Sequence, residues 1–143
     1  MTPVQPQKSW ICSGRFPLEG MSALIIEDNA LIAMNVEVFL LDAGAAVVKT
    51  ANSIASAKSA LDEGIPFDAA VVDLHLADGN ATSLIQALSE RGIAVVITTG
   101  DAARQDQPAH NKAITVLQKP YTDRDLINAL MRCAAAAPVN SMT

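Results

Sequence analysis

Aromatic side chains are scarce in this chain, since tryptophan, tyrosine and phenylalanine together make up only 3% of its 143 residues. Long apolar runs are missing too, because no stretch approaches the roughly 18 residues of a membrane-spanning helix. Basic residues are few, with 10 lysines and arginines against 15 aspartates and glutamates and a pI of about 4.8. Phosphate backbones are bound by clustered basic side chains. We therefore expect a protein that binds neither membranes nor nucleic acid.

Cysteine is almost absent as well. The two cysteines, Cys12 and Cys133, form no CxxC pair and lie near opposite ends of the chain. Neither a zinc site nor a disulfide framework is therefore indicated. Both are expected to be incidental thiols of a reducing compartment, and the protein is expected to be cytoplasmic.

The first 20 residues differ in composition from the rest. They hold three of the seven prolines and the only tryptophan, and they lack the basic and apolar regions of a signal peptide. We interpret residues 1–20 as a leader or added extension that is mobile, with Met21 as a candidate natural start. The alternative is that Trp10, Ile11 and Phe16 pack onto the domain or a partner, because leaving such side chains in water is costly.

Small aliphatic residues are abundant: half of the chain is apolar and its mean hydropathy is +0.26. This composition suits strands that are buried on both faces and covered by alanine-rich helices. Short apolar runs predict five strands, at residues 22–26, 46–50, 67–73, 93–98 and 113–118.

The connections between these strands show helical periodicity, and several are preceded by a capping side chain. Helices are predicted to begin after Asn29, Ser53 and Thr122, and near Thr82. The segment 101–112 has almost no apolar face and is predicted to be a short or frayed helix. Strands that alternate with helices make an α/β domain with a parallel sheet and helices on both faces. We expect this domain to cover residues 21–137, followed by a tail at 138–143.

Polar groups follow the apolar runs at the ends of four predicted strands. They are Glu27 and Asp28, Asp73, Thr99, and Lys119. The carboxyl ends of parallel strands gather in one crevice, which is where such folds bind ligands. These side chains are therefore expected to meet.

The expected crevice suits a metal ion and a phosphoryl group. Three carboxylates repel each other unless a cation lies among them, and Mg²⁺ takes one or two carboxylates together with water and phosphate oxygens. Asp28 and Asp73 fit as direct ligands, and Glu27 fits through a water. Lys119 and Thr99 can each contact a phosphoryl oxygen, so an aspartate here could carry a phosphoryl group. Alternatively, the acidic pair is simply solvated at a helix start, where the dipole favours it.

At these residues the chain resembles a response-regulator receiver domain of two-component signalling. The matching motifs are the acidic pair in LIIEDN, Asp73 in AAVVDLHL, Thr99 in VVITTG and Lys119 in VLQKPY. The resemblance covers about residues 21–137. It implies a flavodoxin-like, doubly wound (βα)5 fold with a five-stranded parallel sheet of order 2-1-3-4-5. It also implies a cis peptide bond before Pro120.

The resemblance also assigns roles to the site. It implies that Asp73 is the phosphoacceptor and that Thr99 and Lys119 contact the phosphoryl group. It implies that Mg²⁺ is held by Glu27, Asp28, Asp73 and the backbone carbonyl of His75. Two further side chains allow simpler readings: Thr98 is strand filler, and the His75 side chain lies either over the site entrance or on plain surface.

The chain departs from the family pattern in its expected signalling route. Val116 occupies the position three before the lysine where receivers often carry Tyr or Phe, and Leu76–Ala77 replaces the usual Met-Pro. In place of the usual switch between the threonine and this aromatic residue, we expect residues 101–112 to change between ordered and disordered states. With the VLQKPY motif, these departures are similar to single-domain receivers that serve HWE-type or related histidine kinases of proteobacteria.

The leading hypothesis is a stand-alone receiver. It would accept a phosphoryl group from a histidine kinase or histidine phosphotransfer protein onto Asp73 with Mg²⁺. It would then switch protein–protein interactions with an unknown downstream protein, or relay phosphate, without being an enzyme beyond its own phosphorylation and dephosphorylation. One alternative is a pseudo-receiver that only binds. Another is a phosphatase with an aspartate nucleophile, which would need a second acid where His75 stands.

Overall fold

Five apolar runs form one parallel sheet. The computed structural model describes residues 16–100 and 113–136. The strands of the sheet are β1 (Ser22–Ile26), β2 (Val47–Ala51), β3 (Ala69–Asp73), β6 (Ala94–Thr99) and β7 (Ile114–Gln118). They lie in the order β2-β1-β3-β6-β7, and every neighbouring pair is parallel. The expected order 2-1-3-4-5 is therefore confirmed.

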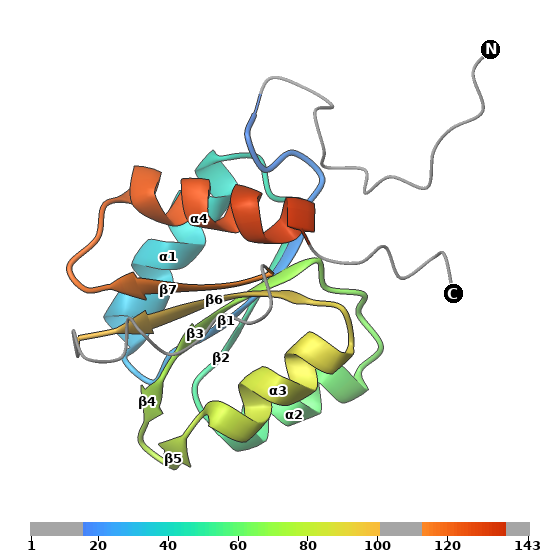
Figure 1. The fold of residues 1–143 in the computed structure, drawn as a ribbon, viewed down its shortest axis with the longest axis vertical. Coiled ribbons are helices and arrows are strands. Elements are labelled where there is room, and N and C mark those ends of the chain that lie inside the picture. Colours follow the sequence, from blue (N-terminus) through green and yellow to red (C-terminus); the bar gives the residue numbers. More distant parts are fainter. Residues whose placement is uncertain (1–15, 101–112, 137–143) are drawn as a thin grey trace.

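Helices cover both faces of this sheet. Within the described residues they are α1 (Ala30–Asp42), α2 (Ile54–Asp62), α3 (Thr82–Glu90) and α4 (Asp123–Ala136). Figure 1 shows α1 and α4 on one face and α2 and α3 on the other. The Asn29 side chain accepts from two backbone N–H groups of α1, which confirms the predicted cap. The predicted helix at 101–112 lies outside the described residues. In the part of the chain that is described, no helix is long and apolar enough to cross a membrane.

Alternation along the strands divides the core into two clusters. In β1, Ala23 and Ile25 join the cluster beneath α1 and α4, whereas Leu24 and Ile26 join the cluster beneath α2 and α3. The strands β3 and β6 divide in the same way. Because successive side chains point to opposite faces, a strand covered on both sides must be apolar at every position. This is why β1, β3 and β6 read as apolar runs.

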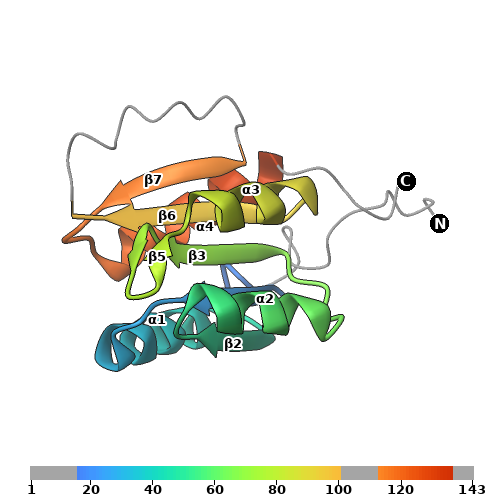
Figure 2. The ribbon, with the colours of Figure 1, turned by 90° about the horizontal axis from the view of Figure 1, so that it is seen from below.

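A small hairpin follows the central strand β3. It consists of β4 (His75–Leu76) and β5 (Gly79–Asn80), which pair antiparallel. The sequence predicts only a turn-rich loop here, because two-residue strands are too short to show periodicity. Figure 1 and Figure 2 place the hairpin beyond the carboxyl end of β3, beside the start of α2.

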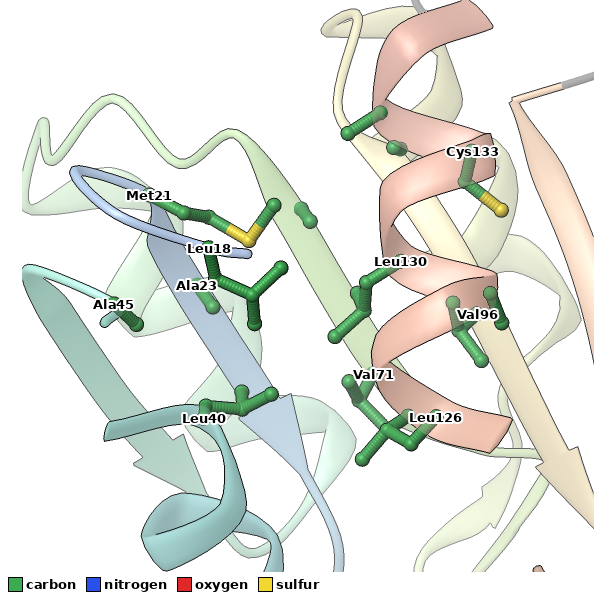
Figure 3. Close-up of a cluster of buried hydrophobic side chains, with 14 of the residues drawn as sticks. Leu18, Met21, Ala23, Leu40, Ala45, Val71, Val96, Leu126, Leu130 and Cys133 are labelled. Carbon is green, nitrogen blue, oxygen red and sulfur yellow. The ribbon is translucent and has the colours of Figure 1, made fainter. Parts of the chain in front are cut away.

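Residues 16–20 pack onto the domain, although their composition placed them in the leader. The Leu18 N–H donates to the Ala43 carbonyl at 2.8 Å, and the Leu18 side chain is fully buried. Gly44 has φ +103°, and a Cβ there would lie 2.5 Å from the Cβ of Phe16. Figure 3 shows Leu18 beside Met21 within the α1/α4 cluster. The packed structure therefore begins before Met21. Trp10, Ile11 and Cys12, like the tail 138–143, lie outside the described residues.

Substitution of Leu18 tests this packing. Leu18→Ala leaves a cavity in the core, so we expect the free energy of unfolding to fall by about 3 kcal/mol in urea denaturation. Leu41→Ala is the matched control, because Leu41 is 47% exposed and should change stability little. Equal losses in the two variants would contradict the packing of this segment.

Candidate functional site

Three carboxylates converge at the carboxyl edge of the sheet. Glu27 directly follows β1 and Asp73 ends β3, and these strands are hydrogen-bonded neighbours. Oxygen atoms of Glu27, Asp28 and Asp73 all lie within 4.8 Å of one another. Glu27 and Asp73 are buried, whereas Asp28 is exposed. The structure therefore brings Asp73 together with the adjacent pair Glu27 and Asp28, from which it is distant in the sequence.

Lys119 contributes a positive charge to this cluster. Its Nζ lies 3.4 Å from Asp73 Oδ2 and 3.7 Å from Glu27 Oε1. It follows β7, and its backbone N–H donates to the Thr99 carbonyl at 2.7 Å. The Lys119–Pro120 peptide is cis, as the resemblance implies. One ammonium beside three carboxylates leaves two negative charges uncompensated when all the acids are ionised.

The two threonines that end β6 are both buried. The Thr98 Oγ1 lies 3.5 Å from the Val72 carbonyl, a backbone contact that suits strand filler. Thr99 is paired with Gln118 in the sheet and is the β6 residue bonded to Lys119. The backbone N–H of His75 donates to Asp73 Oδ1 at 3.0 Å, and its side chain is exposed.

Burial raises the pKa of Glu27 to about 7. Desolvation is the main cause, and the charge of Asp73 adds to it. The N–H of Asn29, which donates to Glu27 Oε2 at 3.1 Å, and the Lys119 ammonium both oppose the shift. A proton on Glu27 thus relieves part of the excess negative charge.

This shift predicts a pH-dependent stability. The folded state holds the Glu27 proton more tightly than the unfolded state, whose pKa is near 4.5. Without metal, the free energy of unfolding should therefore fall as the pH rises from 4.5 to about 7, by up to about 1.4 kcal/mol per pH unit. Urea denaturation across this range measures the slope. Glu27→Gln should remove that fall, and an unchanged profile in the variant would contradict the assignment.

Comparison with known proteins identifies the fold family. The profile of the response regulator receiver domain matches residues 23–131. The chain belongs to this family. Receiver domains of this kind act in two-component signalling, and they bind Mg²⁺ in an acidic pocket.

Solved structures support the same assignment. A response regulator receiver protein from Sinorhizobium medicae WSM419 is 26% identical, with a TM-score of 0.73 over 83% of this chain and 98% of that one. SdrG from Sphingomonas melonis Fr1 is 35% identical, with a TM-score of 0.63 over 80% and 96% of the two chains. A CheY-like receiver domain protein from Methanospirillum hungatei JF-1 shares the fold at 21% identity, with a TM-score of 0.71 over 87% and 100%. No curated protein matches the chain.

The donor set of this receiver domain fits Mg²⁺. The three acids offer only hard oxygen ligands, which Mg²⁺ and Ca²⁺ prefer to softer ligands such as thiolates. The excess of two negative charges matches a divalent cation. Glu27, Asp28 and Asp73 would hold the ion, and the chemistry it supplies is neutralisation of phosphoryl oxygens.

Tyr121 also lies close to the acids of the receiver domain. Burial is the main cause that raises the pKa of its phenol, and the negative charges of Glu27 and Asp73 add to it. The side chain packs against the α1/α4 cluster. The position of Tyr121 directly after Lys119–Pro120 is the signal that could have placed it beside the acids.

Proposed function

We propose that this receiver domain accepts a phosphoryl group on Asp73 from a phosphohistidine of a kinase or phosphotransfer protein. The observation that carries the proposal is the contact of Lys119 with both Asp73 and Glu27, at 3.4 and 3.7 Å. A buried carboxylate that lies beside an ammonium and two further acids suits a Mg²⁺-assisted phosphoryl acceptor. Phosphorylation would then switch binding to a downstream cytoplasmic protein, or the group would be relayed onward.

The transfer is a single displacement at phosphorus. An oxygen of Asp73 forms the new P–O bond while the P–N bond to the donor imidazole breaks, and the imidazole takes a proton from solvent. The Lys119 ammonium and the Thr99 hydroxyl would neutralise and bind the phosphoryl oxygens. The protein thus positions the groups, and the proposal assigns it no catalysis beyond its own phosphorylation and dephosphorylation.

A small phosphodonor tests this proposal without a partner. Incubation with acetyl phosphate and Mg²⁺ should add one phosphoryl group per chain, detected by mass spectrometry. The adduct should be an acyl phosphate that hydroxylamine removes, and it should not form when EDTA removes the metal before acetyl phosphate is added. A chain that stays unmodified would favour a pseudo-receiver. Steady release of phosphate from many small esters would favour a phosphatase.

The exposed face of α1 is suited to packing against a helix of a partner protein. Leu31, Met34, Val38 and Leu41 are 65%, 57%, 47% and 47% exposed, and their 3-4-3 spacing forms one stripe along α1. This spacing is that of the seam between two packed helices. The stripe begins one turn from Asp28, so it is continuous with the acid cluster.

The charge beside this stripe specifies the partner further. The charged residues of α1 are Glu37 and Asp42, both acidic. A cleft of about 480 Å³ lies between α1 and the start of α2, and its lining includes Glu27, Asp28 and Glu37. We therefore propose that the phosphodonor docks a helix whose apolar stripe is flanked by lysine or arginine. A second copy of this acidic chain would fit less well.

Met34→Glu separates docking from chemistry. We expect transfer from a protein phosphodonor to slow at least tenfold, because an added charge would be buried in the apolar seam. Phosphorylation by acetyl phosphate should be unchanged, since Met34 lies outside the acid cluster. Ser59→Glu, at an exposed position of α2, is the control for one added negative charge. Equal slowing with both donors would contradict docking on α1.

A further inference from the structure

The hairpin that follows the phosphoacceptor strand is bonded to a helix that comes before it in the chain. Asp78 lies in the turn between β4 and β5. Its Oδ1 accepts the backbone N–H of Ile54 at 3.1 Å, and its Oδ2 accepts that of Ala55 at 3.3 Å. Ile54 and Ala55 are the first two residues of α2. The carboxylate therefore bridges two segments that are 24 residues apart in the sequence.

These two bonds complete the cap of α2. A helix begins with unpaired backbone N–H groups. Ser53 Oγ accepts the N–H of Ser56 at 3.0 Å, and Ser56 Oγ accepts the N–H of Ser53 at 3.1 Å. This local capping box does not use the N–H groups of Ile54 and Ala55, and both of these donate to the Asp78 carboxylate. The hydrogen bond from Ile54 is the main cause that lowers the pKa of Asp78. The bond from Ala55 and the charge of Lys58 also lower it. Asp78 is thus ionised beside the positive end of the helix dipole.

The other end of the hairpin is bonded to the phosphoacceptor. The His75 N–H donates to Asp73 Oδ1 at 3.0 Å, and the Leu74 N–H donates to the Thr98 carbonyl at 3.0 Å. Leu76 is buried in the α2/α3 cluster. The Ala81 N–H closes the loop on the Leu74 carbonyl at 3.1 Å. One short, bonded segment therefore connects Asp73 to Asp78 and through it to α2.

We propose that Asp78 is a positioning residue for the phosphorylation site. By anchoring the hairpin to α2, it holds the His75 backbone in place, so that the His75 N–H orients the Asp73 carboxylate at 3.0 Å. The His75 carbonyl, which the resemblance implies as a further ligand, would be held by the same anchor when Mg²⁺ is bound. The inference rests on the proposed function, since His75 serves the site only if Asp73 and its metal are used. It also makes α2 sensitive to the state of Asp73, because the same segment touches both.

Asp78→Asn tests this role, with Asp62→Asn as the matched control. Asp62 lies at the other end of α2 and is 79% exposed. We expect Asp78→Asn to weaken Mg²⁺ binding about tenfold, as loss of a supporting partner of a metal ligand does. We also expect faster hydrogen exchange of the His75 amide in metal-free protein. Asp62→Asn should change neither value. If Asp78→Asn leaves both values at those of the parent protein, the proposal is overturned.

A second pair of variants removes the bond from the helix side. Ile54→Pro deletes one donor at the first helical position, where proline is tolerated, and Ser53 already has the extended backbone that proline requires before it. Ile54→Ala loses the side chain but keeps the N–H. Ile54→Pro should weaken Mg²⁺ binding more than Ile54→Ala does. Adding Asp78→Asn to the Ile54→Pro variant should weaken Mg²⁺ binding by a smaller factor than adding Asp78→Asn to the parent protein does. Fully additive losses would overturn the proposal.

These measurements also separate the two hypotheses. If the parent protein binds no Mg²⁺ and takes up no phosphoryl group, the proposed function fails. The exchange of the His75 amide in metal-free Asp78→Asn still reports whether Asp78 positions the hairpin. If the parent protein is phosphorylated and Asp78→Asn behaves like the parent in both binding and exchange, only the positioning role fails.

Discussion

Asp73→Asn is expected to abolish phosphoryl uptake. The amide that replaces the carboxylate has no free anionic oxygen to attack phosphorus. The residue keeps its size, and its side chain can still accept the His75 N–H that the carboxylate accepts at 3.0 Å. Removal of a negative charge beside Glu27 should also lower the pKa of Glu27, because Asp73 contributes to its rise. Mass spectrometry after treatment with acetyl phosphate measures the loss.

Asp62→Asn provides the control for this variant. It makes the same chemical change at an exposed aspartate of α2, 79% accessible at its side chain. Uptake in Asp62→Asn should equal that of the parent protein. A hydroxylamine-sensitive adduct that forms on Asp73→Asn at the parent rate would place the phosphoryl group on another residue and would contradict the assignment.

Lys119→Gln is expected to slow phosphorylation by about a hundredfold, the usual cost of removing one preorganised group that stabilises developing charge. The ammonium is the cation that the described residues place against both Asp73 and Glu27. Without it, the pKa of Glu27 should rise further, since Lys119 holds it down. Stopped-flow or quenched-flow uptake from acetyl phosphate at saturating Mg²⁺ measures the rate.

Lys49→Gln is the matched control for the lysine. The Lys49 Nζ lies 2.6 Å from Glu63 Oε1 in an exposed ion pair, away from the acid cluster. Exposed pairs contribute little to stability, so this variant should fold and react like the parent protein. If both lysine variants react at the parent rate, the ammonium has no role in the transfer.

The strands β1, β3 and β6 were predictable because they are buried on both faces, whereas β2 and β7 at the edges of the sheet are only partly buried. The apolar runs at β1, β3 and β6 can be recognised as strands without knowing which strands pair with them. Their predicted bounds differ from the observed ones by two residues at most. The strand order, in contrast, came from the family resemblance. Alternation of strands and helices gives a parallel sheet but does not rank its strands.

Which face of α1 packs against the sheet was only partly predictable. The sequence places Leu31 among the apolar residues of the helix, yet its side chain is 65% exposed. The helix carries two apolar stripes: one, with Ala33, Val36 and Leu40, faces the core, and the other faces solvent. Periodicity alone cannot decide which stripe meets the sheet, because both repeat with the helical period.

Contacts between segments that are distant in the sequence differ in how far they could be predicted. Lys119 and Asp73 are 46 residues apart, and their meeting was predicted because both stand at strand ends. Asp78 and Ile54 stand at a turn and a helix start, for which no rule of topology predicts a meeting. Leu18 similarly follows an irregular segment whose packing depends on the shape around Gly44. Local patterns hold no information about either contact.

Beryllofluoride with Mg²⁺ tests the central claim most directly, because it mimics a phosphoryl group on an aspartate without a donor protein. Backbone NMR of the parent protein should show shifts around Asp28, Asp73, Thr99 and Lys119, spreading to residues 101–121. Asp73→Asn should show none of these changes. The absence of any response in the parent protein, or the same response in Asp73→Asn, would contradict a phosphorylation switch at Asp73.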